Sequence, residues 1–260
     1  MTQVCISILT SSIQVLIQDH RQNMASSKPQ VELIPWDFTS PEHVERLVQQ
    51  RIACGWDSDA VESWKPKQES GVFNLQWIVL SDDCPDKDNK LLKHTSTYPY
   101  EAVHLQDTAT SYGGKPRAIT LPERTFIPVG HICLGPAPAY WDDPKEPFAE
   151  GSYWISNFYV SRALQFSGVG RAAMDTAERI ATSEPLNARM LGLNAINKVD
   201  PNCEEKYEAL KLPIPPFSNQ GWYERRGYKV YMDIPKAFSK TDSTGKAWFW
   251  DAVCLKKTIL

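Results

Sequence analysis

Apolar residues in this chain recur in short runs that have the length of β-strands. Each run is rich in Val, Ile, Leu or aromatic residues, and polar or proline-containing segments separate one run from the next. Such runs predict strands that are buried in a sheet. The expected strands span residues 31–34, 72–80, 126–134, 154–160, 190–196, 229–234 and 247–255.

Helical spacing follows directly after the first expected strand. Ser40 has the chemistry of an N-cap, and Pro41 fits the first helical position because the backbone N–H that proline lacks would have no partner within the helix there. Gly55 is the expected end of this helix. The apolar face of this helix would hold Val44, Leu47, Val48 and Ile52. A second short helix is expected within residues 56–70.

Two more helices are expected in the second half of the chain. Residues 172–182 keep small apolar side chains on one face and charged side chains on the others, which is typical of a helix packed on a sheet. The apolar face holds Ala173, Ala177, Ile180 and Ala181, and the other faces hold Asp175, Glu178 and Arg179. A further helix is expected around Trp222 and Tyr223.

Three segments without a readable pattern, residues 81–125, 135–150 and 198–219, are interpreted as insertions. The first contains an acidic stretch, residues 82–88, that could be mistaken for a calcium loop. It lacks the glycine and the terminal glutamate of an EF-hand. We interpret it as a solvated loop and predict no metal site.

The most informative segment is VSRALQFSGVGR, residues 160–171, between an expected strand and an expected helix. Gly168 and Gly170 allow backbone N–H groups to approach an anion closely. The N-terminal end of the following helix also favours negative charge. The segment therefore predicts a phosphate cradle and a cofactor that carries a diphosphate.

A dinucleotide is the competing ligand, because residues 168–173 also fit the pattern G-x-G-x-x-G/A. In that motif the first glycine makes the tight turn off the strand, whereas here seven residues separate Val160 from Gly168. The expected strand 190–196 also ends in Asn197, without an Asp or Glu for a ribose hydroxyl. Both features argue against NAD. A glycine-rich helix start without a ligand is the third interpretation.

Two motifs together resemble the GNAT superfamily, the acyl-CoA-dependent N-acyltransferases. Residues 160–170 match its pyrophosphate motif V-x4-Q/R-x-x-G-x-G/A, with Val160, Gln165, Gly168 and Gly170 at the fixed positions. Residues 223–228, YERRGY, are similar to its Y-E-x-x-G-F/Y signature. The resemblance implies an α/β (α+β) fold of GNAT type, a mixed central sheet flanked by helices with long loop insertions, in one N-acetyltransferase domain over residues 31–258.

The resemblance also implies acetyl-CoA as cosubstrate. Backbone N–H groups of the loop would wrap the diphosphate, and Arg162 and Arg171 would add positive charge. The pantetheine arm would lie along the first of two strands that splay apart, residues 154–160 and 190–196. The expected cofactor-binding residues are Phe158, Tyr159, Val160, Gln165, Phe166, Ser167, Gly168, Val169, Gly170, Arg171 and Asn197.

Tyr223 matches the family tyrosine that donates a proton to the CoA thiolate. A phenol with a pKa near 10 is protonated at neutral pH and can fill that role. The general base stays open: one candidate is His131, expected on a strand face with Cys133, and a chain of water molecules is another. Further candidates in the adjacent insertion are Asp142, Asp143 and Glu150.

The sequence departs from the family pattern in two places. Phe166 and Ser167 replace the usual basic residues of the loop. Pro216 and Asn219 occupy the Asn and Ala positions of the pattern N-x-x-A-x-x-x-Y that ends at Tyr223. The pantetheine contact normally made there needs a replacement, for which Asn197 is one candidate.

Composition narrows the class of partner and the compartment. The chain has 260 residues and a net charge of −3, with no long basic block, so we expect neither a nucleic-acid partner nor membrane binding. Its six cysteines form no C-x-x-C pair, and no N-glycosylation sequon is present. These features favour a reducing, cytoplasmic location.

Residues 4–17 are moderately apolar but too short and polar to span a bilayer, and they lack the basic leading region of a secretory signal. We expect residues 1–30 to be a leader or flexible extension, and one hypothesis is that translation starts at Met24.

The function that the sequence favours is N-acetyl transfer from acetyl-CoA to an amine of a small molecule or an amino-acid-like acceptor. A non-catalytic module that binds acyl-CoA is the alternative, and a dinucleotide oxidoreductase ranks third.

Overall fold

The computed structural model describes residues 30–119, 123–136, 150–199, 203–212 and 214–259. The strands are β1 (Val31–Pro35), β2 (Asn74–Leu80), β3 (Leu105–Gln106), β4 (Ser111–Tyr112), β5 (Lys115–Pro116), β6 (Thr125–Phe126), β7 (Gly130–Pro136), β8 (Ser152–Val160), β9 (Met190–Ile196), β10 (Lys229–Thr241) and β11 (Ala247–Thr258). The α-helices are α2 (Pro41–Cys54), α3 (Val61–Glu69), α4 (Lys87–Thr97), α5 (Val169–Ala181), α6 (Cys203–Ala209) and α7 (Asn219–Arg225). Short 3₁₀ turns occur at η1 (Pro99–Ala102) and η3 (Arg162–Leu164).

The first helix is bounded as the sequence predicts. The Ser40 hydroxyl oxygen accepts a hydrogen bond from the backbone N–H of His43, and Pro41 is the first helical residue. Gly55 ends the helix in the left-handed conformation, with φ of 89°. Local chemistry at both ends therefore determines α2.

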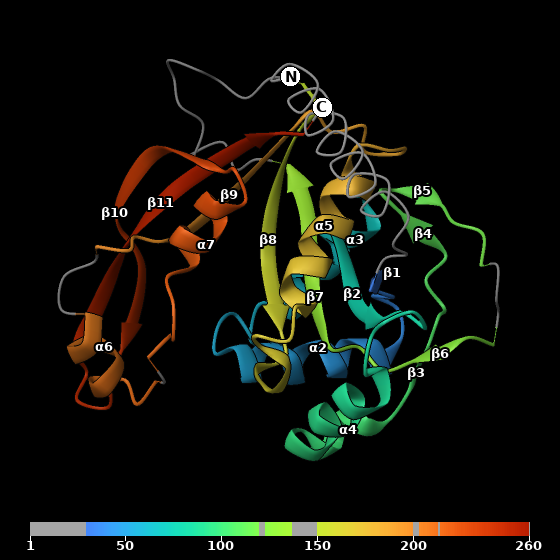
Figure 1. The fold of residues 1–260 in the computed structure, drawn as a ribbon, viewed down its shortest axis with the longest axis horizontal. Coiled ribbons are helices and arrows are strands. Elements are labelled where there is room, and N and C mark those ends of the chain that lie inside the picture. Colours follow the sequence, from blue (N-terminus) through green and yellow to red (C-terminus); the bar gives the residue numbers. More distant parts are fainter. Residues whose placement is uncertain (1–29, 120–122, 137–149, 200–202, 213, 260) are drawn as a thin grey trace, which may run out of the picture.

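One seven-stranded sheet organises the molecule, with strand order β1-β2-β7-β8-β9-β11-β10. Neighbouring strands are antiparallel except β8 and β9, which are parallel. Helix α5 covers one face, and α2 and α3 cover the other (Figure 1). The sheet is thus a mixed sheet flanked by helices, as the GNAT resemblance implies.

Alternating residues of the central strands enter two different cores. On β2, Trp77 packs toward α2 and α3, whereas Ile78 packs toward α5. Every residue of β2 is buried, because helices cover both faces of the sheet. On α5, three residues of the expected apolar face, Ala173, Ala177 and Ala181, are fully buried, whereas the fourth, Ile180, is only partly buried. The small alanine side chains allow the helix to lie close to the sheet.

The long β10–β11 hairpin extends away from the centre of the sheet and carries α6 near its end (Figure 1). A third apolar cluster forms there around Tyr207, Trp248 and Trp250. Trp56, from the turn between α2 and α3, joins it with its ring 5.8 Å from that of Trp250. The turn after α2 is therefore packed against the hairpin.

The segment between β2 and β7 is more ordered than the sequence pattern indicated. Residues 81–125 were expected to form an insertion without readable structure, but they contain α4 and four short strands. The expected strand 126–134 is also shorter, because Phe126 pairs with Leu105 in a separate two-stranded sheet and β7 begins at Gly130. Tertiary contacts, which a local pattern does not report, determine both differences.

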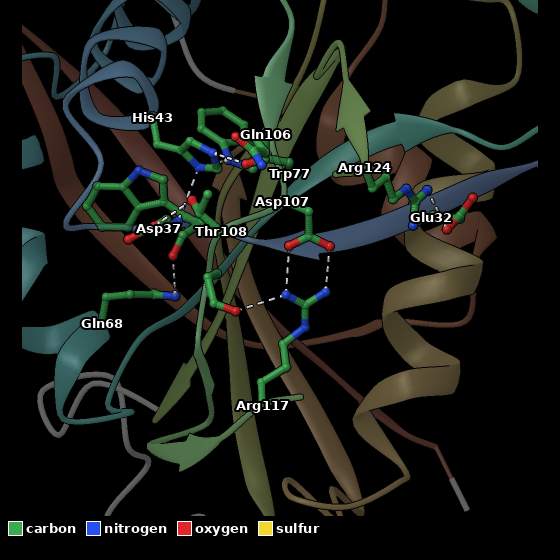
Figure 2. A network of polar contacts seen from close by, with 12 residues as sticks. Glu32, Asp37, His43, Gln68, Trp77, Gln106, Asp107, Thr108, Arg117 and Arg124 are labelled. Atoms are coloured by element: carbon green, nitrogen blue, oxygen red, sulfur yellow. Dashed lines mark hydrogen bonds and ion pairs between the residues drawn. The ribbon is translucent and has the colours of Figure 1, made fainter. Parts of the chain in front are cut away.

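A polar network fixes the second half of this insertion against the first helix (Figure 2). His43 Nδ1 accepts hydrogen bonds from the indole N–H of Trp77 and the backbone N–H of Asp37, so its Nε2 carries the hydrogen and donates to the Gln106 carbonyl at 2.9 Å. Nearby, Arg117 forms a two-bond pair with the Asp107 carboxylate. The insertion is docked on the body of the protein.

The region 198–219 also differs from expectation, because α6 forms within a segment interpreted as irregular. The expected extension over residues 1–30 lies outside the described residues, apart from Gln30. Among the described residues, we find no helix with the length and apolar character needed to cross a bilayer.

Candidate active site

Strands β8 and β9 begin as a pair and then separate. Their parallel ladder joins Ser152 to Met190, Tyr153 to Leu191, and Trp154 to Gly192. Beyond these pairs, β8 continues beside β7 and β9 continues beside β11 (Figure 1). Two strand edges therefore face each other across a widening gap, and such edges can hydrogen-bond an extended ligand.

A β-bulge lies on β8 within the part that has left β9. His131 is opposite Tyr159 and Cys133 is opposite Ser156, so two residues of β8 face one residue of β7. Asn157, in this bulge, has a left-handed φ of 49°. A bulge leaves one backbone unit outside the regular ladder. Backbone polar groups of β8 are thus available at the opening, a feature that the sequence analysis missed.

The glycine loop connects the C-terminal end of β8 to α5. Gly168 is the N-cap of α5 with φ of 86°, a conformation that glycine adopts without the steric cost of a Cβ. None of the described side chains caps this helix, because the Ser167 hydroxyl donates instead to the Leu164 carbonyl at 2.6 Å. The first N–H groups of α5 are therefore suited to an external anion.

The exposed tip of the loop is formed by residues 165–168. Phe166 is 76% exposed and has a left-handed φ of 64°, which is rare for a bulky side chain. Its ring meets that of Phe217 at 5.5 Å. Gln165 and Ser167, two other expected cofactor residues, lie on the same exposed tip, whereas Val169 is buried below it.

The two arginines of the loop have different surroundings. Arg162 donates hydrogen bonds to the carbonyl oxygens of Ala53 and Cys54, at the C-terminal end of α2. Arg171 has a side chain that is 75% exposed and lies 3.9 Å from Asp175. We expected both to add charge to the phosphate cradle. In this structure the Arg162 guanidinium is hydrogen-bonded to the end of α2. The Arg171 side chain is exposed and can reach a ligand.

The three expected residues at the end of β8 point to opposite faces of the sheet. Phe158 and Val160 pack on the side of α5, and the Phe158 ring stacks on Trp222 of α7 at 6.2 Å. Tyr159 is buried on the other side, with its ring 5.5 Å from that of His131. The stacked pair connects β8 to α7 across the gap left by β9.

Tyr223 lies on α7, beside the diverging strands. The Ser218 hydroxyl caps this helix by accepting from the Gly221 N–H. The Tyr223 ring is 8% exposed and packs against Trp222 and Tyr228. Burial raises the pKa of its phenol well above the ordinary value of 10. Tyr223 is therefore protonated at neutral pH, as a proton donor must be.

His131 is fully buried, and hydrogen bonds engage both ring nitrogens. Its Nδ1 donates to Gln50 Oε1 at 2.9 Å, and Nε2 accepts from Arg51 Nη1 at 3.4 Å. Burial, with a smaller contribution from the Arg51 charge, lowers the pKa of the imidazole well below its usual value. The ring is neutral, but the nitrogen that would accept a proton already faces a cation. This geometry argues against direct proton transfer from an acceptor.

Four further residues were expected at the site, Asn197, Glu150, Asp142 and Asp143. Asn197 follows β9, where its Nδ2 donates to Asp233 at 3.3 Å and its Oδ1 accepts from the Val199 N–H. Glu150 is exposed, and Asp142 and Asp143 lie outside the described residues. The Asn197 side chain is thus bonded to β10 and to its own turn.

A pocket of about 490 Å³ lies between α5, α7 and β11, beside the first turn of α5. Four cationic side chains and two carboxylates share its walls with the Trp222 ring. This excess of positive charge favours an anionic ligand. The lining residues are Arg171, Asp175, Glu178, Trp222, Arg225, Arg226 and Lys257.

No protein-family model matches the sequence, and no curated protein matches it. Solved structures do match. An acetyltransferase assigned to the GNAT family from Desulfovibrio desulfuricans is 13% identical with a TM-score of 0.48, covering 88% of this chain and 99% of its own. An aminoglycoside 6'-N-acetyltransferase complexed with coenzyme A is 12% identical, with a TM-score of 0.47 and coverage of 88% and 97%. A spermidine/spermine N-acetyltransferase from Vibrio cholerae is 9% identical, with a TM-score of 0.47 and coverage of 88% and 93%.

These likenesses concern the fold. The parallel pair that opens and the glycine loop before α5 are features that the resemblance implied, and both are present. The chain has a fold of GNAT type, with an ordered insertion between β2 and β7.

Proposed function

We propose that this protein transfers an acetyl group from acetyl-CoA to an amine of a small molecule or an amino-acid-like acceptor. The observation that carries the proposal is the gap between β8 and β9, which ends at an uncapped helix N-terminus. An extended pantetheine arm fits facing strand edges, and a diphosphate fits free N–H groups beside a helix dipole. One ligand with both parts is a CoA thioester.

The residues that would hold this cosubstrate follow from their positions. Residues 165–171 would bind the diphosphate, and Arg171 would add charge from the exposed face of α5. Phe158 and Val160 would line the arm on the side of α5. The pocket between α5 and α7 would take the nucleotide end, where its cationic side chains favour a phosphate.

A CoA thioester supplies an activated acyl carbon that an amine can attack. As the amine nitrogen bonds to this carbon and the carbon–sulfur bond breaks, charge develops first on the carbonyl oxygen and then on sulfur. A backbone N–H released by the bulge around Asn157 would donate to the oxygen. The Tyr223 hydroxyl would donate its proton to the sulfur, and the phenolate would regain a proton from solvent before the next turnover. Each group acts from a rigid element, either the edge of β8 or helix α7.

Proton removal from the amine is assigned to a chain of water molecules rather than to His131. The reason is that the Arg51 guanidinium faces the nitrogen of His131 that would have to accept the proton. The enclosed imidazole also favours the second candidate function, a module that binds acyl-CoA without turnover.

The first experiment is a thermal-melting comparison of the purified chain with acetyl-CoA, CoA and NADPH. A ligand present at 100 times its Kd stabilises the folded form by about 2.7 kcal/mol, which is readily detected. A shift specific to the two CoA species supports the proposal, and no shift with either contradicts it. Release of free thiol from acetyl-CoA in the presence of candidate amines then separates an acetyltransferase from a non-catalytic module.

A further inference from the structure

Ser161 is the pivot between β8 and the glycine loop. Its backbone N–H donates to the Val129 carbonyl at 2.8 Å, and its own carbonyl accepts from the Leu164 N–H at 2.8 Å. Its hydroxyl lies 2.9 Å from His94 Nδ1. The first bond joins the loop to the segment before β7, the second starts the η3 turn, and the third joins the loop to a different part of the chain.

That part is the insertion between β2 and β7. His94 is in the last turn of α4, and Glu101 follows in η1. Both side chains are fully buried, with His94 Nε2 at 3.4 Å from Glu101 Oε2. Nε2 thus faces the carboxylate, and Nδ1 faces the Ser161 hydroxyl. Burial of two ionisable groups is costly unless they are paired or hydrogen-bonded. Here His94 Nδ1 and Glu101 Oε2 have hydrogen-bond partners, whereas His94 Nε2 and Glu101 Oε1 have none beyond the ion-pair contact.

The same network continues into the body of the protein. Gln50 Nε2 donates to Glu101 Oε2 at 2.8 Å, and Gln50 Oε1 accepts from His131 Nδ1. Glu101 is thus fixed from α2 as well as from α4. A change in the position of His94 would therefore break contacts on both sides. Ser161 is therefore connected through His94 and Glu101 to Gln50 of α2, on the face of the sheet opposite α5.

The rest of the loop depends on this anchor. Helix α4 packs against η3, and Leu164 at the end of η3 is fully buried. By contrast, residues 165–168 are exposed, and Phe166 among them has an unfavourable backbone conformation. The exposed tip can hold one geometry only if its buried base is rigid.

We propose that His94 is a positioning residue for the diphosphate loop, which makes the insertion between β2 and β7 part of the cofactor site. This inference rests on the proposed function, because the loop is assigned to the diphosphate of CoA there. His94 acts through Ser161 and does not touch the ligand.

The test compares His94→Leu, which removes the ring nitrogens, with His94→Asn, whose amide places a polar atom near the position of Nδ1. Ser161→Ala removes the other partner with little change in volume and serves if His94→Leu does not fold. His104→Leu is the matched control, because His104 is an exposed histidine of the same insertion. Each folded variant is measured by CoA calorimetry and by hydrogen exchange of residues 162–168 in the absence of ligand.

We expect His94→Leu and Ser161→Ala each to raise the Kd for CoA about tenfold, the equivalent of one lost hydrogen bond. The double variant should bind no more weakly than either single variant, because both remove the same contact. Exchange of the loop should be faster while exchange of β11 is unchanged. His94→Asn should recover most of the affinity, and His104→Leu should match the natural protein.

Unchanged exchange of the loop in folded His94→Leu or Ser161→Ala overturns the inference. Faster exchange with an unchanged Kd for CoA also overturns it, because the contact would then serve stability alone. If the natural protein does not bind CoA, the proposed function fails, and the exchange measurement still decides whether His94 positions the loop.

Discussion

The ring of Trp154 occupies the space that a side chain at position 192 would need. Trp154 and Gly192 are the last residues paired between β8 and β9, and a Cβ at Gly192 would lie 2.5 Å from two carbons of that ring. The indole therefore sits over the point where the two strands separate. Residue size at one position helps to determine where the gap begins.

Gly192→Ala should lower the free energy of unfolding by about 1–3 kcal/mol, because the new methyl group forces Trp154 or the strand to move. Gly221→Ala is the control. This glycine is within α7, and a Cβ there has ordinary contacts, so alanine should be neutral or stabilise by up to about 1 kcal/mol. Urea unfolding measures both. Equal effects of the two substitutions would contradict the steric explanation.

Tyr223→Phe should lower the turnover number about a hundredfold and leave CoA affinity nearly unchanged, because it removes a proton donor and keeps the ring in the core. The matched control is Tyr228→Phe, because the Tyr228 hydroxyl donates to Glu178 of α5. That variant should lose stability rather than rate. Steady-state kinetics with calorimetry distinguishes them, and unchanged turnover in Tyr223→Phe dismisses the acid role.

Because His131 is buried with a lowered pKa, we expect the free energy of unfolding to fall in mild acid. Its pKa is lowered in the folded protein, so below about pH 6.5 the unfolded chain takes up a proton that the folded chain excludes. Stability should therefore fall as pH falls through this window, by about 1.4 kcal/mol per pH unit for one fully excluded proton. His43 has a lowered pKa, chiefly from burial, and adds to the effect in the same direction.

Urea unfolding at pH 7.5 and pH 5.5 tests this dependence. His131→Gln should reduce the difference in unfolding free energy between the two pH values, because one of the excluded protons is removed. His104→Gln changes an exposed histidine and should leave the difference as it is in the natural protein. An identical pH dependence in all three proteins would show that His131 is protonated in the folded state.

Substitution of Arg162 should affect mainly stability, whereas substitution of Arg171 should affect mainly ligand binding. Arg162→Ala removes the donors to the Ala53 and Cys54 carbonyls and should lower the free energy of unfolding by about 1 kcal/mol. Arg171→Ala should leave stability unchanged and weaken CoA binding several-fold at low salt, with a smaller effect at high salt because the side chain is exposed. Thermal melting and calorimetry at two salt concentrations measure both effects. Weaker CoA binding by Arg162→Ala alone would reverse these assignments.

Local chemistry made most elements of the sheet predictable. The runs that became β1, β8 and β9 lie in one continuous sheet, and their composition alone predicts strands. Ser40 and Gly55 delimit α2 through hydrogen bonds that involve only nearby backbone. Signals of this kind are complete within a short window of sequence.

The insertion was less predictable because its order depends on distant partners. Arg117 and Asp107 pair within it, and Gln106 reaches His43 on α2. Residues 87–97 carry a weakly apolar face, so the pattern alone did not indicate α4. Asn157 was the one local signal of the bulge, since asparagine tolerates a left-handed backbone better than most residues.

The sequence by itself determined most strands of the main sheet, the two ends of α2 and the glycine loop, because each depends on the chemistry of adjacent residues. Only the tertiary structure decided which of these features meet. The Trp154 ring packs over Gly192 at the point where β8 and β9 separate. Arg51 donates to His131 Nε2, the nitrogen that would accept a proton if His131 were the general base. His94 reaches Ser161 from a segment 67 residues away. Such contacts arise from three-dimensional packing, which no local pattern records.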